Sequence, residues 1–266
     1  MGQYKNKISF PVMIPILLSL AFAALPYLFS PANAAAAGER IITVAAASDL
    51  NFAFKDIAAV FEKETGIKVI LSFGSTGMLA KQISGGAPFD LFFAADRKYL
   101  EDLSGKGLII PSSVERYALG VVVLAVNKSS GIEVRELKDL LKPEIRNVAI
   151  ANPDHAPYGR AAMEALKSAG LRDKLKDKLV YGENIRQTIQ FIQTGNAQAG
   201  IVALSLANVP EITYVRIDTF LYNPIDQAVG IVKTSKDPGA AASFIRYVKG
   251  PVGSEVMKKY GFIMTH

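Results

Sequence analysis

Apolar residues in this chain form short continuous runs that alternate with segments of helical periodicity. Runs rich in β-branched residues predict buried strands, and apolar residues at three- and four-residue spacing predict helices. We predict strands at residues 41–46, 67–73, 90–94, 117–127, 148–151, 179–181, 200–204 and 225–232. We predict helices at residues 50–66, 78–83, 160–169, 184–194 and 238–249.

This alternation of strands and helices is typical of α/β proteins with mostly parallel sheets flanked by helices. Two of the predicted strands are unusually long and carry an internal glycine, Gly120 in one and Gly230 in the other. We interpret both as hinge strands that join two domains, since φ/ψ changes at a few such positions are enough for closure. The predicted domains are residues 35–118 with 226–266, to which the last helix returns, and residues 119–225.

Residues 1–34 have the pattern of a secretion signal. Lys5 and Lys7 precede a long apolar stretch, and small residues around Ala34 offer a cleavage site. The alternative is a retained membrane anchor, because the stretch is long enough to span a bilayer. Three prolines interrupt it, so we favour cleavage after Ala34 and a periplasmic location.

The composition excludes several kinds of site. The chain has no cysteine, and therefore no disulfide, thiolate metal site or lipid-bearing cysteine. Its formal charge of +6 becomes +4 without the leader, which carries two lysines and no acid. This mild positive charge suits an anion. Basic residues are spread along helices with no helix-turn-helix or zinc spacing, so we expect no nucleic-acid partner.

Two turns with hydroxyl residues stand where a predicted strand gives way to a helix. Ser48 follows the first strand, and Ser75 follows the second. A helix N-terminus has free N–H groups and the positive end of the helix dipole, which favour an anion. Taken singly, either serine could be an ordinary N-cap; together they predict an oxyanion site.

At these turns the sequence resembles the periplasmic molybdate-binding proteins of bacterial ABC transporters, which belong to the type II substrate-binding class. The resemblance covers nearly all of residues 41–266. The segments that carry it are AAASDL (45–50), FGSTGMLAKQI (73–83), GAPFDLFFAAD (86–96), NPDHAPYG (152–159), NIRQ (184–187) and GNAQAGIVA (195–203). It implies a two-domain periplasmic binding protein that captures molybdate, and tungstate, for an ABC permease.

The resemblance also implies the binding residues. Ser48 and Ser75 match the two hydroxyl positions, while Tyr158 and Ile185 match positions whose backbone amides point at the anion. Many family members carry a further tyrosine where this chain has Ala203. We expect the phenol of Tyr158 to fill that gap. The family holds its dianion without a metal or a neutralising cation.

The resemblance therefore implies a monomeric carrier that is not an enzyme and needs no cofactor. A binder of sulfate or another tetrahedral oxyanion is the alternative within the class. A periplasmic serine hydrolase using Ser48 or Ser75 with His155 is the alternative from another class. It lacks the G-x-S-x-G elbow, and we interpret His155 as a structural turn residue.

The remaining charged residues near these turns receive structural interpretations. We expect Asp49 to point away from the ligand as a helix cap. Asp90 and Asp96 flank a strand and are expected to cap or to form salt bridges. Lys81, Arg160 and Arg186 follow the binding turns, and we assign them to solvated helix surface or to pairing between the domains.

Overall fold

The computed structural model describes residues 39–265. The predicted leader, its cleavage site and the alternative membrane anchor lie outside these residues. Within the described part of the chain, no helix has the length and apolar character needed to cross a membrane. Residues 38–266 form one compact unit that contains two sheets.

The first sheet has six strands in the order β11-β4-β10-β3-β1-β2. Its strands are β1 (Ile41–Ala47), β2 (Lys68–Gly74), β3 (Leu91–Ala94), β4 (Glu115–Gly120), β10 (Ile225–Ile231) and β11 (Ile263–Met264). Its helices are α1 (Asn51–Thr65), α2 (Thr76–Ser84), α3 (Arg97–Gly105), α8 (Pro238–Lys249) and α9 (Pro251–Lys259).

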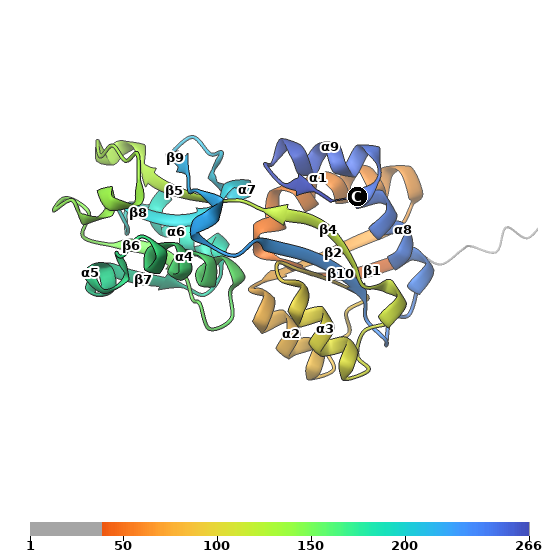
Figure 1. The fold of residues 1–266 in the computed structure, drawn as a ribbon. Coiled ribbons are helices and arrows are strands. Elements are labelled where there is room, and N and C mark those ends of the chain that lie inside the picture. Colours follow the sequence, from red (N-terminus) through yellow and green to blue (C-terminus); the bar gives the residue numbers. More distant parts are fainter. Residues whose placement is uncertain (1–38, 266) are drawn as a thin grey trace, which may run out of the picture. The chain divides into compact units, whose positions relative to one another are not determined.

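These helices cover both faces of the first sheet, as Figure 1 shows. Val44 packs with α1 and α8 around Phe54 and Phe244, whereas its neighbour Ala45 packs with α2 and α3 on the opposite face. Successive residues of a strand point to opposite faces, so a strand covered on both sides must be apolar throughout. Burial on both faces explains the continuous apolar runs in the sequence.

The second sheet has five strands in the order β7-β6-β8-β5-β9. Its strands are β5 (Val122–Asn127), β6 (Val148–Ala151), β7 (Leu179–Gly182), β8 (Ala199–Ala203) and β9 (Ile212–Arg216). The accompanying helices are α4 (Pro157–Ser168), α5 (Arg172–Leu175), α6 (Ile185–Gln193) and α7 (Leu204–Ala207). We call each sheet with its helices a lobe.

The predicted fold class is confirmed, with one correction to the sheets. Both are mixed and not mostly parallel: β1 pairs in parallel with β2 and β3, but β10 runs antiparallel to β3 and β4. In the second sheet, β5 is antiparallel to β8 and β9. The reason is connectivity. β5 and β10 each follow a crossing from the other lobe, and each runs antiparallel to the neighbouring strand of the βα units in its sheet.

The two predicted hinge strands differ in how they cross. The first apolar run divides at Val121 into β4 of the first sheet and β5 of the second. On the return, the segment at Tyr222 connects the lobes and β10 lies wholly in the first sheet. The domain boundaries at residues 118 and 225 stay a prediction.

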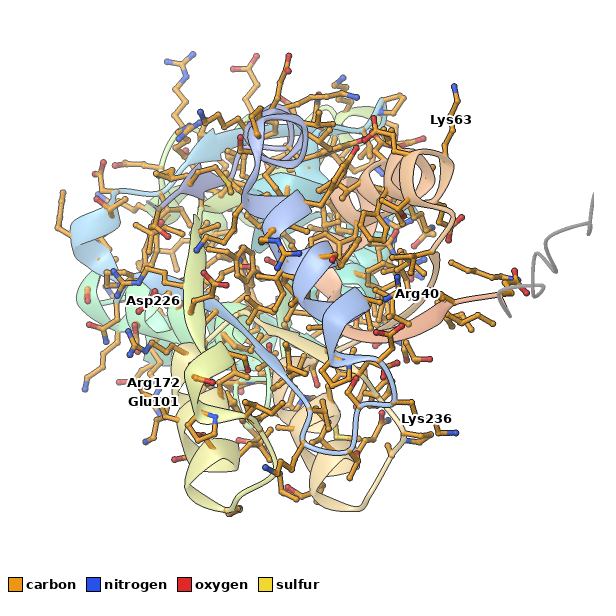
Figure 2. The ribbon with its side chains drawn as sticks, turned by 90° about the vertical axis from the view of Figure 1, so that its right-hand side faces the viewer. Arg40, Lys63, Glu101, Arg172, Asp226 and Lys236 are labelled. Carbon is orange, nitrogen blue, oxygen red and sulfur yellow. The ribbon has the colours of Figure 1, made fainter. Side chains whose placement is uncertain are left out.

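Figure 2 places Lys63 and Lys236 at the edge of the described chain. Both residues are exposed, as is Glu101. The first sheet's interior is instead built from aromatic rings: Phe54, Phe93 and Phe244 contact one another edge to face. Charge is therefore available mainly at the surface, which makes the few buried polar residues informative.

Candidate functional site

The two predicted serines lie side by side in the first lobe. Strands β1 and β2 are parallel, and their register pairs Ala47 with Gly74, the last residues of the two strands. Ser48 then opens a short 3₁₀ turn (Ser48–Leu50), and Ser75 is the N-cap of α2. Parallel pairing therefore brings both hydroxyls to one edge of the sheet.

The second lobe repeats this arrangement with two helix starts. Strands β6 and β7 are parallel and pair Ala151 with Gly182 at their ends. Tyr158 is the second residue of α4, after a proline that has no N–H, and Ile185 is the first residue of α6. Both backbone amides thus belong to the first turn of a helix, where N–H groups have no partner within the helix.

One small cavity brings all four predicted residues together. Its lining comprises Ala47, Ser48, Asp49, Gly74, Ser75, Thr76, Ala95, Ala156, Pro157, Tyr158 and Ile185. Its volume is about 10 Å³, room for about one water-sized group, whereas other hollows of the described chain reach about 480 Å³. A space of this size suits a small ion better than a metabolite. That these residues bind a ligand stays a prediction.

The backbone amides of these four residues are available to a ligand. Among residues 39–265, no protein atom accepts a hydrogen bond from the N–H of Ser48, Ser75, Tyr158 or Ile185. In α6 the side chain of the N-cap Asn184 accepts from the amides of Arg186 and Gln187 but not from the amide of Ile185. Buried N–H groups are nearly always paired with protein or ordered water, so four without a protein partner around one cavity are available to an acceptor-rich ligand.

Neither serine serves as an ordinary N-cap. No side-chain capping bond is formed at Ser75; its Oγ lies 2.8 Å from Nδ1 of His155, which belongs to the other lobe. Ser48 makes no side-chain hydrogen bond within the described residues and is 3% exposed. Both hydroxyls are therefore positioned at the cavity by the fold and not by a local capping requirement.

The expectation that Asp49 caps a helix is wrong. Its turn has no side-chain cap, and the carboxylate Oδ2 accepts hydrogen bonds from Tyr158 Oη at 3.0 Å and from Gln227 Nε2 at 2.6 Å. Its other oxygen, Oδ1, is buried without a partner in the described residues. Burial raises the pKa of Asp49 to about 6, although both hydrogen bonds favour the ionised form. Asp49 thus joins the hinge strand β10 to α4.

This bond also decides where the Tyr158 phenol points. Its hydroxyl donates to Asp49 and accepts from Gln227 at 3.2 Å, close to Gly120 at the end of β4. Burial, followed by the charge of Asp49, raises the pKa of Tyr158 well above its ordinary value, so the phenol keeps its proton. The hydroxyl is engaged at the hinge, and the amide of Tyr158 is the group that remains for a ligand.

Further contacts between the lobes surround the cavity. The guanidinium of Arg160 on α4 donates to Asp96 at 2.5 Å and to the Tyr99 hydroxyl at 3.1 Å. Arg186 on α6 lies over the ring of Phe52, 5.0 Å from its centre. Both arginines thus follow the interdomain alternative of the prediction.

Asp96 also follows its prediction: besides pairing with Arg160, it caps α3 by accepting from Lys98 N. Asp90 is buried and accepts from Thr43 N and Lys236 N, so it ties the first lobe together. Lys81 is exposed on α2, as expected of solvated helix surface. These charged groups stabilise the frame, and the cavity wall itself carries no cationic side chain.

Sequence reasoning missed the partners of the site residues. These partners come from three parts of the second lobe and hinge. His155 lies in the loop before α4 and contacts Ser75, and Gln227 lies in the hinge strand β10 and donates to Asp49. The hydroxyl of Ser205 in α7 donates to the backbone carbonyl of Asp49 at 2.8 Å. These contacts join residues 80 to 178 positions apart, and no local spacing announces them. Within the described chain, no cluster of three or more His, Cys, Asp or Glu side chains could hold a metal ion.

Comparison with known proteins places the chain among anion carriers. It is 41% identical to the molybdate-binding protein ModA of Azotobacter vinelandii over 241 residues, 86% of this chain and 92% of the relative. It is 36% identical to ModA of Rhodobacter capsulatus over 94% of this chain and 98% of that protein. The solved periplasmic molybdate-binding protein of Azotobacter vinelandii superposes with a TM-score of 0.80 at 32% identity, covering 85% of this chain and all of that one. The model of the bacterial extracellular solute-binding proteins matches residues 42–263, and the chain belongs to that family.

Proposed function

We propose that this protein captures molybdate, and also tungstate, in the cavity between its two lobes. The observation that carries the proposal is the donor set: four unpaired backbone amides and two serine hydroxyls around one small space. The similarity to the molybdate-binding proteins supports the same ligand. We assign the contacts to Ser48, Ser75, Tyr158 and Ile185, the last two through their amides.

The chemistry of the donor set favours a fully deprotonated tetrahedral dianion. Such an ion has only acceptor oxygens, so N–H and O–H groups can satisfy all of them. A protonated phosphate would bring its own O–H and need an acceptor. Asp49 is the one carboxylate in the cavity lining: its Oδ2 is engaged by Tyr158 and Gln227, so only its Oδ1 is free to accept, against six donors.

The number of donors is sufficient for tight binding. A hydrogen bond to a charged group contributes about 1.5 to 3 kcal/mol. Six such bonds must exceed the large cost of removing water from a dianion. We expect a Kd between about micromolar and nanomolar, which corresponds to roughly −8 to −12 kcal/mol.

The proposed carrier acts in the periplasm as a monomer and passes its ion to an ABC permease of the inner membrane. It catalyses no reaction and needs no cofactor. Its domains are residues 35–118 with 226–266, and 119–225, and the lobes close by rotation at the two crossings between the sheets. Uncharged donors fit this role, because a cationic site would hold the ion in a deeper electrostatic well and slow its release.

Titration calorimetry with molybdate, tungstate, sulfate and phosphate tests the proposal. We expect molybdate and tungstate to bind and phosphate to fail. If sulfate binds as tightly as molybdate, the proposed ligand is wrong and the smaller oxyanion takes its place in the proposal. Crystals soaked in tungstate test the location, since the heavy atom must lie between Ser48 and Ser75.

The contact between Ser75 and His155 favours a hydrolase as the second candidate, because it pairs a hydroxyl with a base. A triad also needs a group that orients the base. Glu183 Oε1 is 4.0 Å from His155 Nε2, too far for a hydrogen bond. An ester assay separates the two: the carrier shows no turnover, whereas turnover that disappears in His155→Ala would establish the hydrolase.

A further inference from the structure

His155 contacts a proposed ligand donor from the opposite lobe. Its Nδ1 lies 2.8 Å from Ser75 Oγ, and its backbone carbonyl accepts from Gly77 N at 2.9 Å. Ser75 is 4% exposed, and the imidazole is 19% exposed. The histidine therefore stands directly behind a hydroxyl that faces the cavity.

A serine hydroxyl has one proton, which it can give to only one partner. If Nδ1 carries no proton, it accepts the Ser75 proton, and Oγ then presents only lone pairs to the cavity. If Nδ1 carries a proton, it donates to Oγ, and Ser75 can give its own proton to an oxyanion. A proton on Nδ1, in the imidazolium or in the neutral Nδ1–H tautomer, thus decides whether Ser75 donates to an anion or presents only lone pairs to it.

The second ring nitrogen lies near a carboxylate: Nε2 is 4.0 Å from Glu183 Oε1. Both ring nitrogens therefore have an oxygen of another residue close by. A neutral ring has one proton for two positions, whereas the imidazolium provides N–H groups at both. Other charged or titratable side chains beside His155 are Asp154 in its own loop, Lys81 on α2, Tyr99 and Asp102 on α3, and Lys106 just after α3.

We propose that His155 is a positioning residue of the oxyanion site: as the imidazolium it donates from Nδ1 to Ser75 Oγ and makes that hydroxyl a donor to the bound dianion. This inference rests on the proposed function and adds to it the uptake of one proton on binding. Capture of the dianion is coupled to protonation of His155. The proton comes from solvent and returns to it when the ion leaves.

The coupling has a defined sign. Because the ligand binds the protonated form, affinity rises as pH falls through the range in which histidine ordinarily changes charge, between pH 5 and 8. One linked proton changes affinity by at most about tenfold per pH unit. We expect molybdate binding about five- to thirtyfold tighter at pH 6 than at pH 8. Above the titration range, binding takes up close to one proton.

Two variants separate positioning from simple packing. His155→Asn places an amide N–H near the position of Nδ1, so it donates to Ser75 at every pH. It should bind molybdate more tightly than His155→Ala, and neither should show the pH dependence or the proton uptake that His155 supplies. Asp49, whose pKa is about 6, also titrates in this range. Asp49→Asn should therefore keep the part of the pH dependence that His155 supplies.

Calorimetry with sodium molybdate at pH 6, 7 and 8, in buffers of different ionisation enthalpy, gives both the affinity and the number of protons taken up. Thermal unfolding of each variant shows that it is folded. Tighter binding at low pH that disappears in both His155 variants supports the inference. Wild-type binding without proton uptake, or a His155→Ala variant that keeps the pH dependence, overturns it and leaves the carrier function intact. Failure of the wild type to bind molybdate or tungstate at any pH overturns both.

Discussion

Replacing Gly77 by alanine should weaken ligand binding without weakening the fold. Gly77 lies in the first turn of α2, and a Cβ there would sit 2.8 Å from His155 Cβ and 2.9 Å from its carbonyl oxygen, across the lobe boundary. Carbon atoms ordinarily approach to about 3.5–4.0 Å. The lobes must therefore move apart at this point, because backbone atoms cannot rotate away.

The magnitude follows from the contacts that are lost. Overpacking costs about 1–3 kcal/mol, and the bond from Gly77 N to His155 O contributes about 1 kcal/mol. The closed form loses about 2–4 kcal/mol, so the Kd for molybdate should rise roughly 30- to 1,000-fold. The same substitution stabilises the helix by up to about 1 kcal/mol, since alanine has the higher helix propensity.

Calorimetry and urea unfolding measure the two effects on one protein. Gly105→Ala is the matched control, because Gly105 ends α3 and an added Cβ meets no atom within 4 Å. This control should keep its affinity. Wild-type affinity in Gly77→Ala would refute the argument that binding requires the lobes to meet at His155.

The remaining predictions concern the cavity and its buried acid. Ser48→Ala and Ser75→Ala should each weaken molybdate binding by about 1.5–3 kcal/mol, which calorimetry measures as a Kd roughly 10- to 150-fold higher. The control Ser168→Ala, at the exposed end of α4, should keep the wild-type affinity. Unchanged affinity in both cavity variants would contradict the assigned site. Burial raises the Asp49 pKa from 3.8 to about 6. Between these values the native state keeps a proton that the unfolded chain releases. The stability that this proton supplies is lost as pH rises through 6. In urea unfolding, Asp49→Asn should therefore gain up to about 3 kcal/mol relative to wild type between pH 4 and pH 7, whereas the exposed control Asp177→Asn shows no such trend.

Secondary structure was predictable where burial and local signals agree. Residues 148–151 and 238–249 have the predicted bounds, because β6 is buried throughout and α8 begins at a proline after the capping Asp237. Helix α9 escaped prediction, because it begins with Pro251 and has a glycine in its first turn, a pattern typical of turns. The run 117–127 is almost continuously apolar in sequence, and only Gly120, the last residue of β4, marks the division at Val121.

The neighbouring positions of Ser48 and Ser75 follow from two strand-to-helix turns, because parallel strands end at the same edge of a sheet. Tyr158 and Ile185 were implied only by the family resemblance, and the role of all four in binding stays a prediction. The atoms that these residues contact could not be predicted. Asp49 has the residue type of a helix cap, but its carboxylate bonds to Gln227 and Tyr158, 178 and 109 residues away. Such contacts depend on how two lobes meet, and a local pattern contains no information about that.

The proposed site predicts that ligand binding and closure depend on each other, because its four amides have no protein partner. In a closed, ligand-free protein each buried N–H without an acceptor costs about 1–3 kcal/mol, so four of them oppose closure by roughly 4–12 kcal/mol. Contacts between the lobes favour closure, but the partly exposed ion pair of Arg160 with Asp96 contributes only about 0–1 kcal/mol. The buried hydrogen bond from Ser205 to the Asp49 carbonyl adds about 1 kcal/mol. A dianion turns the opposing amides into favourable bonds, and it can do so only when Ser48, Tyr158 and Ile185 face the same space. Closure is then a population shift driven by the ion. The observed binding free energy of the wild type should equal the free energy gained from the hydrogen bonds to the ion, reduced by the free energy needed to close the lobes.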